Sequence, residues 1–396
     1  MQRELKDSGS PEGRADKGVF RRMREKYTEW RGRRKEKLAG KLIAREEWYG
    51  VPGLGTHAIN PLLYALGHPG FYETKEEGVD TLRTILERNP RLDPELAAPF
   101  SRFFMDESKV MRHIAFRSVR SIMEENPERD WSFLAKPSAD ALNNLGDEQE
   151  MPKYLLTLIG MKAVPVLMEM LEKREGILAG AAEVLGKIAA RHQGEDWGAV
   201  IDVLLGVMKQ MYRAGFIAKS LERIGLERLN WEDRAFCMVV LGKVDEVDKL
   251  GEQAVPIIKR ALDTCFNSDC ARVAGVLAIR HPEYDWTPIV QPLLFVMEYN
   301  NRVDADFAKD ALASIPAQAV GILIETLGDR EHSHAALAAL EYLCGRCPEE
   351  TALAIVRFVN GKGGDKLIEI SSANETLVKM LNDLMLQCGK GMQDAA

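Results

Sequence analysis

The chain has 396 residues, of which 46% are hydrophobic and 29% are charged, and its formal net charge is −7. This apolar content is enough to bury a core, which excludes an intrinsically disordered chain. No run of eighteen apolar residues is present to span a bilayer, and residues 1–18 lack the apolar segment of a signal peptide. We therefore expect a cytoplasmic protein.

The cysteines support the same expectation. All six lie in apolar helical stretches and lack the regular spacing of a disulfide framework: Cys237, Cys265, Cys270, Cys344, Cys347 and Cys388. This usage is typical of reduced, buried thiols in a reducing compartment.

The charge is distributed unevenly along the chain. Residues 1–139 carry a net charge of +4 and residues 140–396 a net charge of −11. The segment FRRMREKYTEWRGRRKEK, residues 20–37, holds nine basic and three acidic residues, and Phe20, Met23, Tyr27 and Trp30 recur in it at helical spacing. We predict a disordered tail over residues 1–19 and then a basic amphipathic helix, with a Gly-rich connector running to residue 56.

Further along, the sequence repeats one layout. The stretch GMKAVPVLMEMLEKREGILAGAAEVLGKIAARH, residues 160–192, predicts two antiparallel amphipathic helices of about twelve residues joined by a charged turn. Similar pairs are predicted over residues 93–127, 251–281 and 316–343. These units resemble HEAT repeats, in particular the HEAT-like repeats of phycobilisome lyases.

The resemblance covers residues 57–388 with nine or ten helix pairs and is weaker over residues 131–160, 230–250 and after 361. It implies an all-α fold, an α-α superhelix or HEAT-like solenoid, preceded by the basic N-terminal helix. Each unit buries its apolar face only by stacking on its neighbours. A capping box at residues 372–375 predicts a terminal cap helix, and residues 389–396 are expected to form a flexible tail.

Four dipeptides stand directly before new helices: Asp130-Trp131, Asp196-Trp197, Asn230-Trp231 and Asp285-Trp286. We expect each Asp or Asn to cap its helix and each Trp to cover the junction with the preceding pair. Their spacing indicates that a helix pair between residues 231 and 286 is shortened, and we expect the shortened pair around AFCMVVLGKVDEVDKL.

The sequence offers little catalytic chemistry. Deoxyhypusine hydroxylases of similar architecture hold iron with repeated His-Glu pairs, but none of the seven histidines here is followed by Glu. The CGRC stretch, residues 344–347, ends a predicted helix, where the helix dipole favours the neutral thiol. No phosphate loop or other catalytic motif is present, so we predict a non-enzymatic protein with no cofactor and no metal.

Two basic surfaces are the candidate partner-binding sites. In the first, residues of the basic helix combine donors for phosphate or carboxylate with aromatic rings: Arg21, Arg22, Arg24, Tyr27, Trp30, Arg31, Arg33, Arg34 and Lys35. In the second, a basic ridge lies opposite the apolar stripe of the helix that follows residue 108: Lys109, Arg112, His113, Arg117 and Arg120. The ridge faces the concave surface if its helix is the second of a pair.

The leading hypothesis is a scaffold or adaptor that binds protein partners through its concave surface and basic helix. The alternative is RNA or DNA binding through phosphate contacts and base stacking. For the basic helix, docking on the chain's own first repeat and binding to an anionic membrane also remain open. A more distant hypothesis is an alkylpurine DNA glycosylase or a lyase, because such glycosylases are similar stacked-helix proteins with a catalytic Asp. The partner and the oligomeric state are not determined by these patterns.

Overall fold

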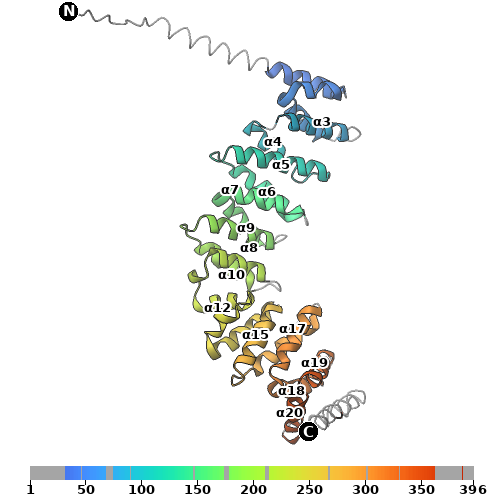
Figure 1. Cartoon of the computed structure of the whole chain (residues 1–396). Coiled ribbons are helices and arrows are strands. Elements are labelled where there is room, and N and C mark those ends of the chain that lie inside the picture. Colours follow the sequence, from blue (N-terminus) through green and yellow to red (C-terminus); the bar gives the residue numbers. More distant parts are fainter. Residues whose placement is uncertain are drawn as a thin grey trace, which may run out of the picture. The chain divides into compact units, whose positions relative to one another are not determined.

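The computed structural model describes residues 32–45, 47–67, 75–89, 91–145, 148–173, 178–209, 214–265, 268–299, 302–329, 331–361 and 386. All regular structure in these ranges is helical, as Figure 1 shows. The prediction of an all-α fold is thus confirmed. The expected tail, most of the basic helix, the cap helix before Leu386 and the last ten residues lie outside the described residues.

The chain divides into two compact units, Met1–Val166 and Leu167–Ala396. In the first unit a helix over residues 32–44 precedes η1 (Trp48–Gly50), η2 (Pro52–Ala58), α2 (Ile59–Leu66), α3 (Lys75–Arg88), η4 (Pro94–Leu96), α4 (Ala97–Ser101), α5 (Lys109–Glu125), η5 (Ser132–Leu134), α6 (Ala135–Asn144), α7 (Glu150–Ile159) and η7 (Gly160–Ala163). The unit boundary falls within α8 (Val164–Lys173).

The second unit continues with α9 (Leu178–Arg191), α10 (Gly198–Met208), α11 (Gly215–Ile224), η8 (Leu226–Arg228), α12 (Trp231–Val240), α13 (Val244–Asp248), η9 (Gly251–Gln253), α14 (Ala254–Cys265), α15 (Ser268–Arg280), η10 (Thr287–Ile289), α16 (Val290–Tyr299), α17 (Arg302–Ala313), α18 (Pro316–Thr326), α19 (Ser333–Arg346) and α20 (Pro348–Asn360).

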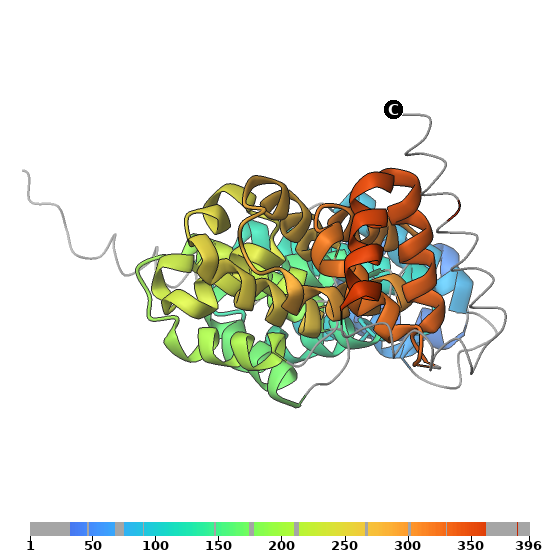
Figure 2. The same cartoon turned by 90° about the horizontal axis from the view of Figure 1, so that it is seen from below.

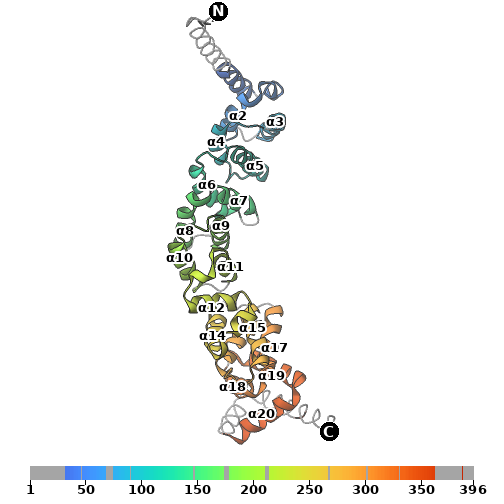
Figure 3. The same ribbon diagram turned by 60° about the vertical axis from the view of Figure 1, so that its left-hand side comes forward.

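Helices of successive pairs form two layers within each unit. In the first unit α2 packs on α4, while α3, α5 and α7 follow one another in the other layer (Figure 3). In the second unit α9 packs on α11, α15 packs on α17 and α17 on α19, and the opposite layer contains α12, α14, α16, α18 and α20. Figure 2 shows α18, α19 and α20 side by side at the end of the described chain. Each helix therefore buries its apolar stripe against neighbouring pairs, as a helical-repeat architecture requires.

The predicted helix pairs are confirmed in all four stretches with the clearest pattern. Residues 93–127 contain α4 and α5, residues 160–192 contain α8 and α9, residues 251–281 contain α14 and α15, and residues 316–343 contain α18 and most of α19. The irregular interval is also confirmed, since α12 is followed by α13, a helix of five residues.

Three of the four Asp/Asn-Trp junctions share one local structure. The buried indole donates its Nε1–H to the carbonyl five residues earlier: Trp131 to Asn126 (3.0 Å), Trp197 to His192 (3.1 Å) and Trp286 to His281 (2.9 Å). The preceding Asp accepts the backbone N–H two residues on: Ser132, Gly198 and Thr287. The predicted roles of Asp and Trp are confirmed at these junctions.

The prediction is wrong for Trp231, whose side chain is 55% exposed. Asn230 caps α12 by accepting the Asp233 N–H at 2.9 Å, so Trp231 becomes the first residue of the helix. In the other three junctions the Trp lies before a helical turn and folds back over the previous pair. At those junctions the N-cap position falls on the Trp itself, whereas here it falls on Asn230, so this helix begins one residue earlier and the Trp231 ring is exposed to solvent.

One described stretch, Glu150–Lys173, meets the length and composition criteria of a membrane-spanning helix, and Val303–Ala313 with Pro316–Thr326 meets them only as a pair bent by 118°. In Glu150–Lys173 the positive φ of Gly160 (68°) separates α7 from α8. Core helices of repeat proteins pass the same criteria, because their apolar faces are buried by neighbours.

Candidate partner-binding surface

Of the predicted basic-helix site, Arg33, Arg34 and Lys35 lie in the helix over residues 32–44. The first two are exposed and the third is half-buried. The remaining six residues, Arg21, Arg22, Arg24, Tyr27, Trp30 and Arg31, are outside the described residues. The structure therefore describes the C-terminal end of this predicted site.

The basic ridge lies on α5, the second helix of its pair. Its helix begins at the capping residue Ser108, whose hydroxyl accepts the Met111 N–H. The predicted apolar stripe of α5 is buried, and Phe116 and Ser118 are buried with it. Phe116 stacks on Phe104 with ring centroids 4.2 Å apart, which fixes α5 against the turn that follows α4.

Arg112 has an internal structural role. Its guanidinium donates to both carboxylate oxygens of Glu148, at 2.9 and 3.1 Å, and to the carbonyls of Asp106 and Glu107. The side chain is 15% exposed. The Arg112 guanidinium also lowers the pKa of Glu148. Because its donors are engaged by the protein itself, Arg112 holds the start of α5 to the turn before α7 and is not a free anion contact.

Arg120 also has partners within the protein. It donates to Glu124 at 2.8 Å and lies over the Tyr154 ring at 4.5 Å. The Tyr154 hydroxyl donates to Glu124 at 2.6 Å, and this bond, together with that from Arg120, lowers the pKa of the Glu124 carboxyl. The three side chains join α5 to α7.

The rest of the ridge is open to solvent. Lys109 is 78% exposed and lies 3.3 Å from Glu148, whose oxygens are already bound by Arg112. Within the part of the chain that the structure describes, the exposed side chains of His113 and Arg117 have no hydrogen-bond or ion-pair partner. Lys109, His113 and Arg117 are spaced by four residues, so they form one row along α5, called here the α5 row.

The exposed side of α3, the neighbour of α5 in this layer, is acidic. Its exposed carboxylates are Glu76, Glu77, Asp80 and Glu87, against the basic Arg83 and Arg88. Asp80 is paired with Arg83 at 3.3 Å. Among the described residues, the α5 row is therefore a short basic strip on a helix that packs against an acidic one.

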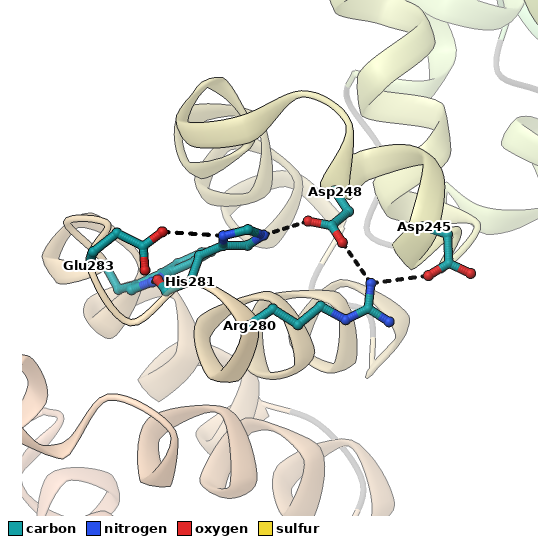
Figure 4. A network of polar contacts seen from close by, with 6 residues as sticks. Asp245, Asp248, Arg280, His281 and Glu283 are labelled. Carbon is teal, nitrogen blue, oxygen red and sulfur yellow. Dashed lines mark hydrogen bonds and ion pairs between the residues drawn. The ribbon is translucent and has the colours of Figure 1, made fainter.

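A second polar cluster joins the shortened pair to the next one. Arg280 donates to Asp245 (3.0 Å) and Asp248 (2.7 Å), and the imidazole of His281 lies 2.6 Å from Asp248 and 3.3 Å from Glu283 (Figure 4). Tyr284 stacks on the His281 ring at 4.7 Å. Asp248, and to a lesser extent Glu283, raises the pKa of His281, whereas His281 and Arg280 lower the pKa of Asp248. These contacts hold α13 against the end of α15.

The five cysteines within the described residues are free thiols, and Cys388 lies outside those residues. Burial raises the pKa of Cys237 and of Cys265 to about 12, and it raises that of Cys270 well above its ordinary value. Cys344 is buried at the end of α19, and the Cys347 thiol donates to the Leu343 carbonyl at 3.3 Å. Among the described residues no group of three or more His, Cys, Asp or Glu is placed to hold a metal ion.

The comparisons with known proteins add little. No protein-family model and no curated protein matches the sequence. A solved structure entitled "Circular tandem repeat protein with novel repeat topology and enhanced subunit contact surfaces" aligns over 96% of this chain and 93% of its own, at 14% identity and a TM-score of 0.20. The layered helix pairs themselves define the class: the chain is an all-α helical-repeat protein.

Proposed function

We propose that this helical-repeat protein is a non-enzymatic scaffold of the HEAT-like type, which binds a protein partner bearing acidic side chains. The α5 row carries the proposal. Lys109, His113 and Arg117 form a strip two turns long on the second helix of a pair, which in HEAT-like solenoids lines the concave face. Arg117 and the His113 imidazole, with the 78% exposed Lys109 one turn before them, suit a short acidic segment, because their nitrogens can donate to separate carboxylates.

The HEAT-like assignment is supported by contacts that recur at one repeat length. Arg112 and Glu148 are 36 residues apart, Glu298 and His332 are 34 apart, and Gln318 donates to the Tyr284 carbonyl 34 residues earlier. Contacts at this spacing are expected when each helix pair packs only on its neighbours.

Nucleic-acid binding is the second candidate, and the surroundings of the α5 row disfavour it. A phosphate backbone requires several cations along an extended path, and Arg112 and Arg120 are engaged by carboxylates of the protein. The exposed carboxylates of α3, which packs on α5, would also repel phosphate. The basic segment at residues 20–37 keeps this candidate open.

For the glycosylase hypothesis, the Asp-Trp dipeptides are the candidates for the catalytic Asp, and their contacts disfavour that role. Asp130 accepts the Ser132 N–H and pairs with Lys162 at 2.9 Å, and these contacts lower the pKa of its carboxyl to about 2. Asp196 is likewise used to accept the Gly198 N–H. A carboxylate of such low basicity is a poor general base.

Affinity capture from cell extract tests the proposal with one double variant and one control. The double variant His113→Glu/Arg117→Glu reverses the charge of the α5 row. The control variant Lys136→Glu changes a 60% exposed side chain on α6, in the other layer of the same unit. We expect discrete protein partners that the double variant loses and the control retains. Partners that both proteins retain equally would contradict the role of the row.

A filter-binding salt series with duplex DNA and single-stranded RNA distinguishes nucleic-acid binding from the scaffold proposal. The scaffold proposal predicts weak binding that changes little between about 50 and 200 mM salt. Tight binding that falls by several orders of magnitude over this range would favour the nucleic-acid hypothesis instead.

A further inference from the structure

A groove in the first unit is not part of the α5 row. It has a volume of about 1070 Å³ and lies between the helix over residues 32–44, α2 and the turn after α4. Its lining includes the apolar side chains Ile43, Leu63, Tyr64, Phe103 and Met105. Grooves formed by helices and lined in this way are typical receptors for an amphipathic helix.

The groove combines a buried floor with exposed apolar walls. Ile43, Leu63 and Phe103 are at most 5% exposed, whereas Tyr64 is 75% and Met105 45% exposed. Exposed aromatic and methionine side chains beside a concavity are typical of interaction sites. The acidic side chains in the lining, Glu36, Asp106 and Glu107, outnumber the basic one, Arg102.

We infer that this groove is the docking site for residues 20–30 of a second copy of the chain, and that the two copies exchange these segments reciprocally. The segment carries Phe20, Met23, Tyr27 and Trp30 on one predicted helical face, which is the anchor spacing that a helix-binding groove accepts. From Phe20 to Arg31 it has five basic and two acidic residues, so its charge complements the acidic lining.

The position of the segment in the chain favours a second copy over the same chain. Residue 32 already lies in a helix, and Glu36 and Ile43 of that helix line the groove. For Trp30 to dock in its own groove, the chain would have to reverse direction within Arg31. Connections between antiparallel helices use about two to five residues. The segment is followed directly in the sequence by the helix that forms one wall of the groove. A two-fold axis between two copies can therefore place each segment in the groove of the other copy.

The expected buried area is adequate for a stable pair. An aromatic side chain buries about 150–250 Å². The three aromatic anchors of both segments together therefore bury on the order of 1,000 Å² before the groove residues are counted. Stable interfaces bury about 1,200–2,000 Å² in total.

Zero-length carbodiimide coupling on the full chain tests the contact. Unlabelled and ¹⁵N-labelled chains are mixed in equal amounts, coupled, digested and analysed by mass spectrometry. Lys26, next to the Tyr27 anchor, should form amides with Glu36 or Glu107, and about half of these peptide pairs should join an unlabelled to a labelled peptide. Pairs formed only within one isotope would show docking in the same chain and overturn the exchange. Absence of Lys26 coupling to either carboxylate would overturn the groove assignment.

Sedimentation velocity tests the assembly with matched variants. We expect a dimer whose dissociation constant rises at least about tenfold in Tyr64→Asp and in Met105→Asp, because each places a charge against an apolar anchor. Phe133→Asp alters a 47% exposed side chain of the same unit outside the groove and should leave the constant unchanged. A chain that is monomeric at all concentrations, or a dimer indifferent to both groove variants, would overturn the inference. Matching circular dichroism melts identify variants that remain folded.

Discussion

Arg112 and Arg117 lie on the same helix, α5, but their surroundings differ. Arg112 is 15% exposed and its donors are bound by Glu148 and two carbonyls. Arg117 is exposed and has no such partner among the described residues. Both residues are arginines on the polar side of the predicted helix. The sequence pattern therefore does not distinguish the internally paired Arg112 from the exposed Arg117.

The two arginines give a paired stability prediction. Arg112→Ala should lower the free energy of unfolding by about 2 kcal/mol, because it removes charge-assisted hydrogen bonds and leaves Glu148 without its main partner. Arg117→Ala should change it by less than about 0.5 kcal/mol. Urea titration measures both. Equal effects of the two substitutions would show that the Glu148 contact is not structural.

The tryptophans give a second pair. Trp286 is fully buried and donates to the His281 carbonyl, so Trp286→Phe should cost about 2–3 kcal/mol through the lost indole hydrogen bond and the residual cavity. Trp231 is 55% exposed, and Trp231→Phe should cost less than about 0.5 kcal/mol. Thermal unfolding compares the two, and a large loss in Trp231→Phe would contradict its placement at the surface.

At the scale of elements, the contact between α15 and α17 depends on a glycine. A Cβ built at Gly275 would lie 3.1 Å from the Cα of Ala311, so Gly275→Ala should cost about 1–3 kcal/mol by forcing the helices apart. At Gly206 on α10 a Cβ meets nothing within 4 Å, and Gly206→Ala should stabilise the helix by up to about 1 kcal/mol. Urea titration of both variants tests the close packing. A harmless Gly275→Ala would contradict it.

The short helix α13 should be held to α15 in a pH-dependent way. Contacts with Asp248 and Glu283 raise the folded pKa of His281 above its ordinary value of 6.5, so the stabilisation is fully present below about pH 6.5 and is lost as the pH rises through the raised pKa. The pKa of Asp248 is lowered from 3.8, so its contribution is present above about pH 4 and is lost as the pH falls through the lowered pKa.

Hydrogen exchange measures this dependence. After correction for intrinsic rates, the α13 amides should open more readily at pH 8 than at pH 6, whereas His281→Asn should show little difference between these values. The α19 amides near His332, which is paired with Glu298 at 2.7 Å, serve as an internal comparison because the His281 variant leaves that pair intact. Equal opening of α13 at both pH values in the unaltered protein would contradict the role of His281.

The helices were largely predictable from the sequence, because the spacing of apolar residues within each short stretch determines them. Apolar spacing predicted the pairs over residues 160–192 and 251–281, and the irregular Trp spacing predicted the short pair that contains α13. Trp231 was not predictable in the same way, since a one-residue shift of the capping position decides whether its ring is buried. Local sequence patterns predict helical periodicity well, but they do not predict a one-residue shift of a capping position.

The candidate surface was less predictable, because partners one repeat away decide which side chains remain free. Glu148 pairs with Arg112 from a position 36 residues further along the chain, and the ring of Tyr154, 34 residues further along, covers Arg120. The repeat length is the signal in the sequence that could have identified them. The groove beside Tyr64 and Met105 is formed by three separate segments of the chain, so no local sequence pattern predicts it.

At the scale of the whole molecule, the central claim is that this helical-repeat protein binds a protein partner through the α5 row. Site-specific photo-crosslinking in cell extract tests it most directly, with a photoreactive phenylalanine at position 113 and, as a control, at position 136. The claim predicts protein adducts at position 113 that survive nuclease treatment and are absent from position 136. Nuclease-sensitive adducts at position 113, or the same adducts at both positions, would contradict it.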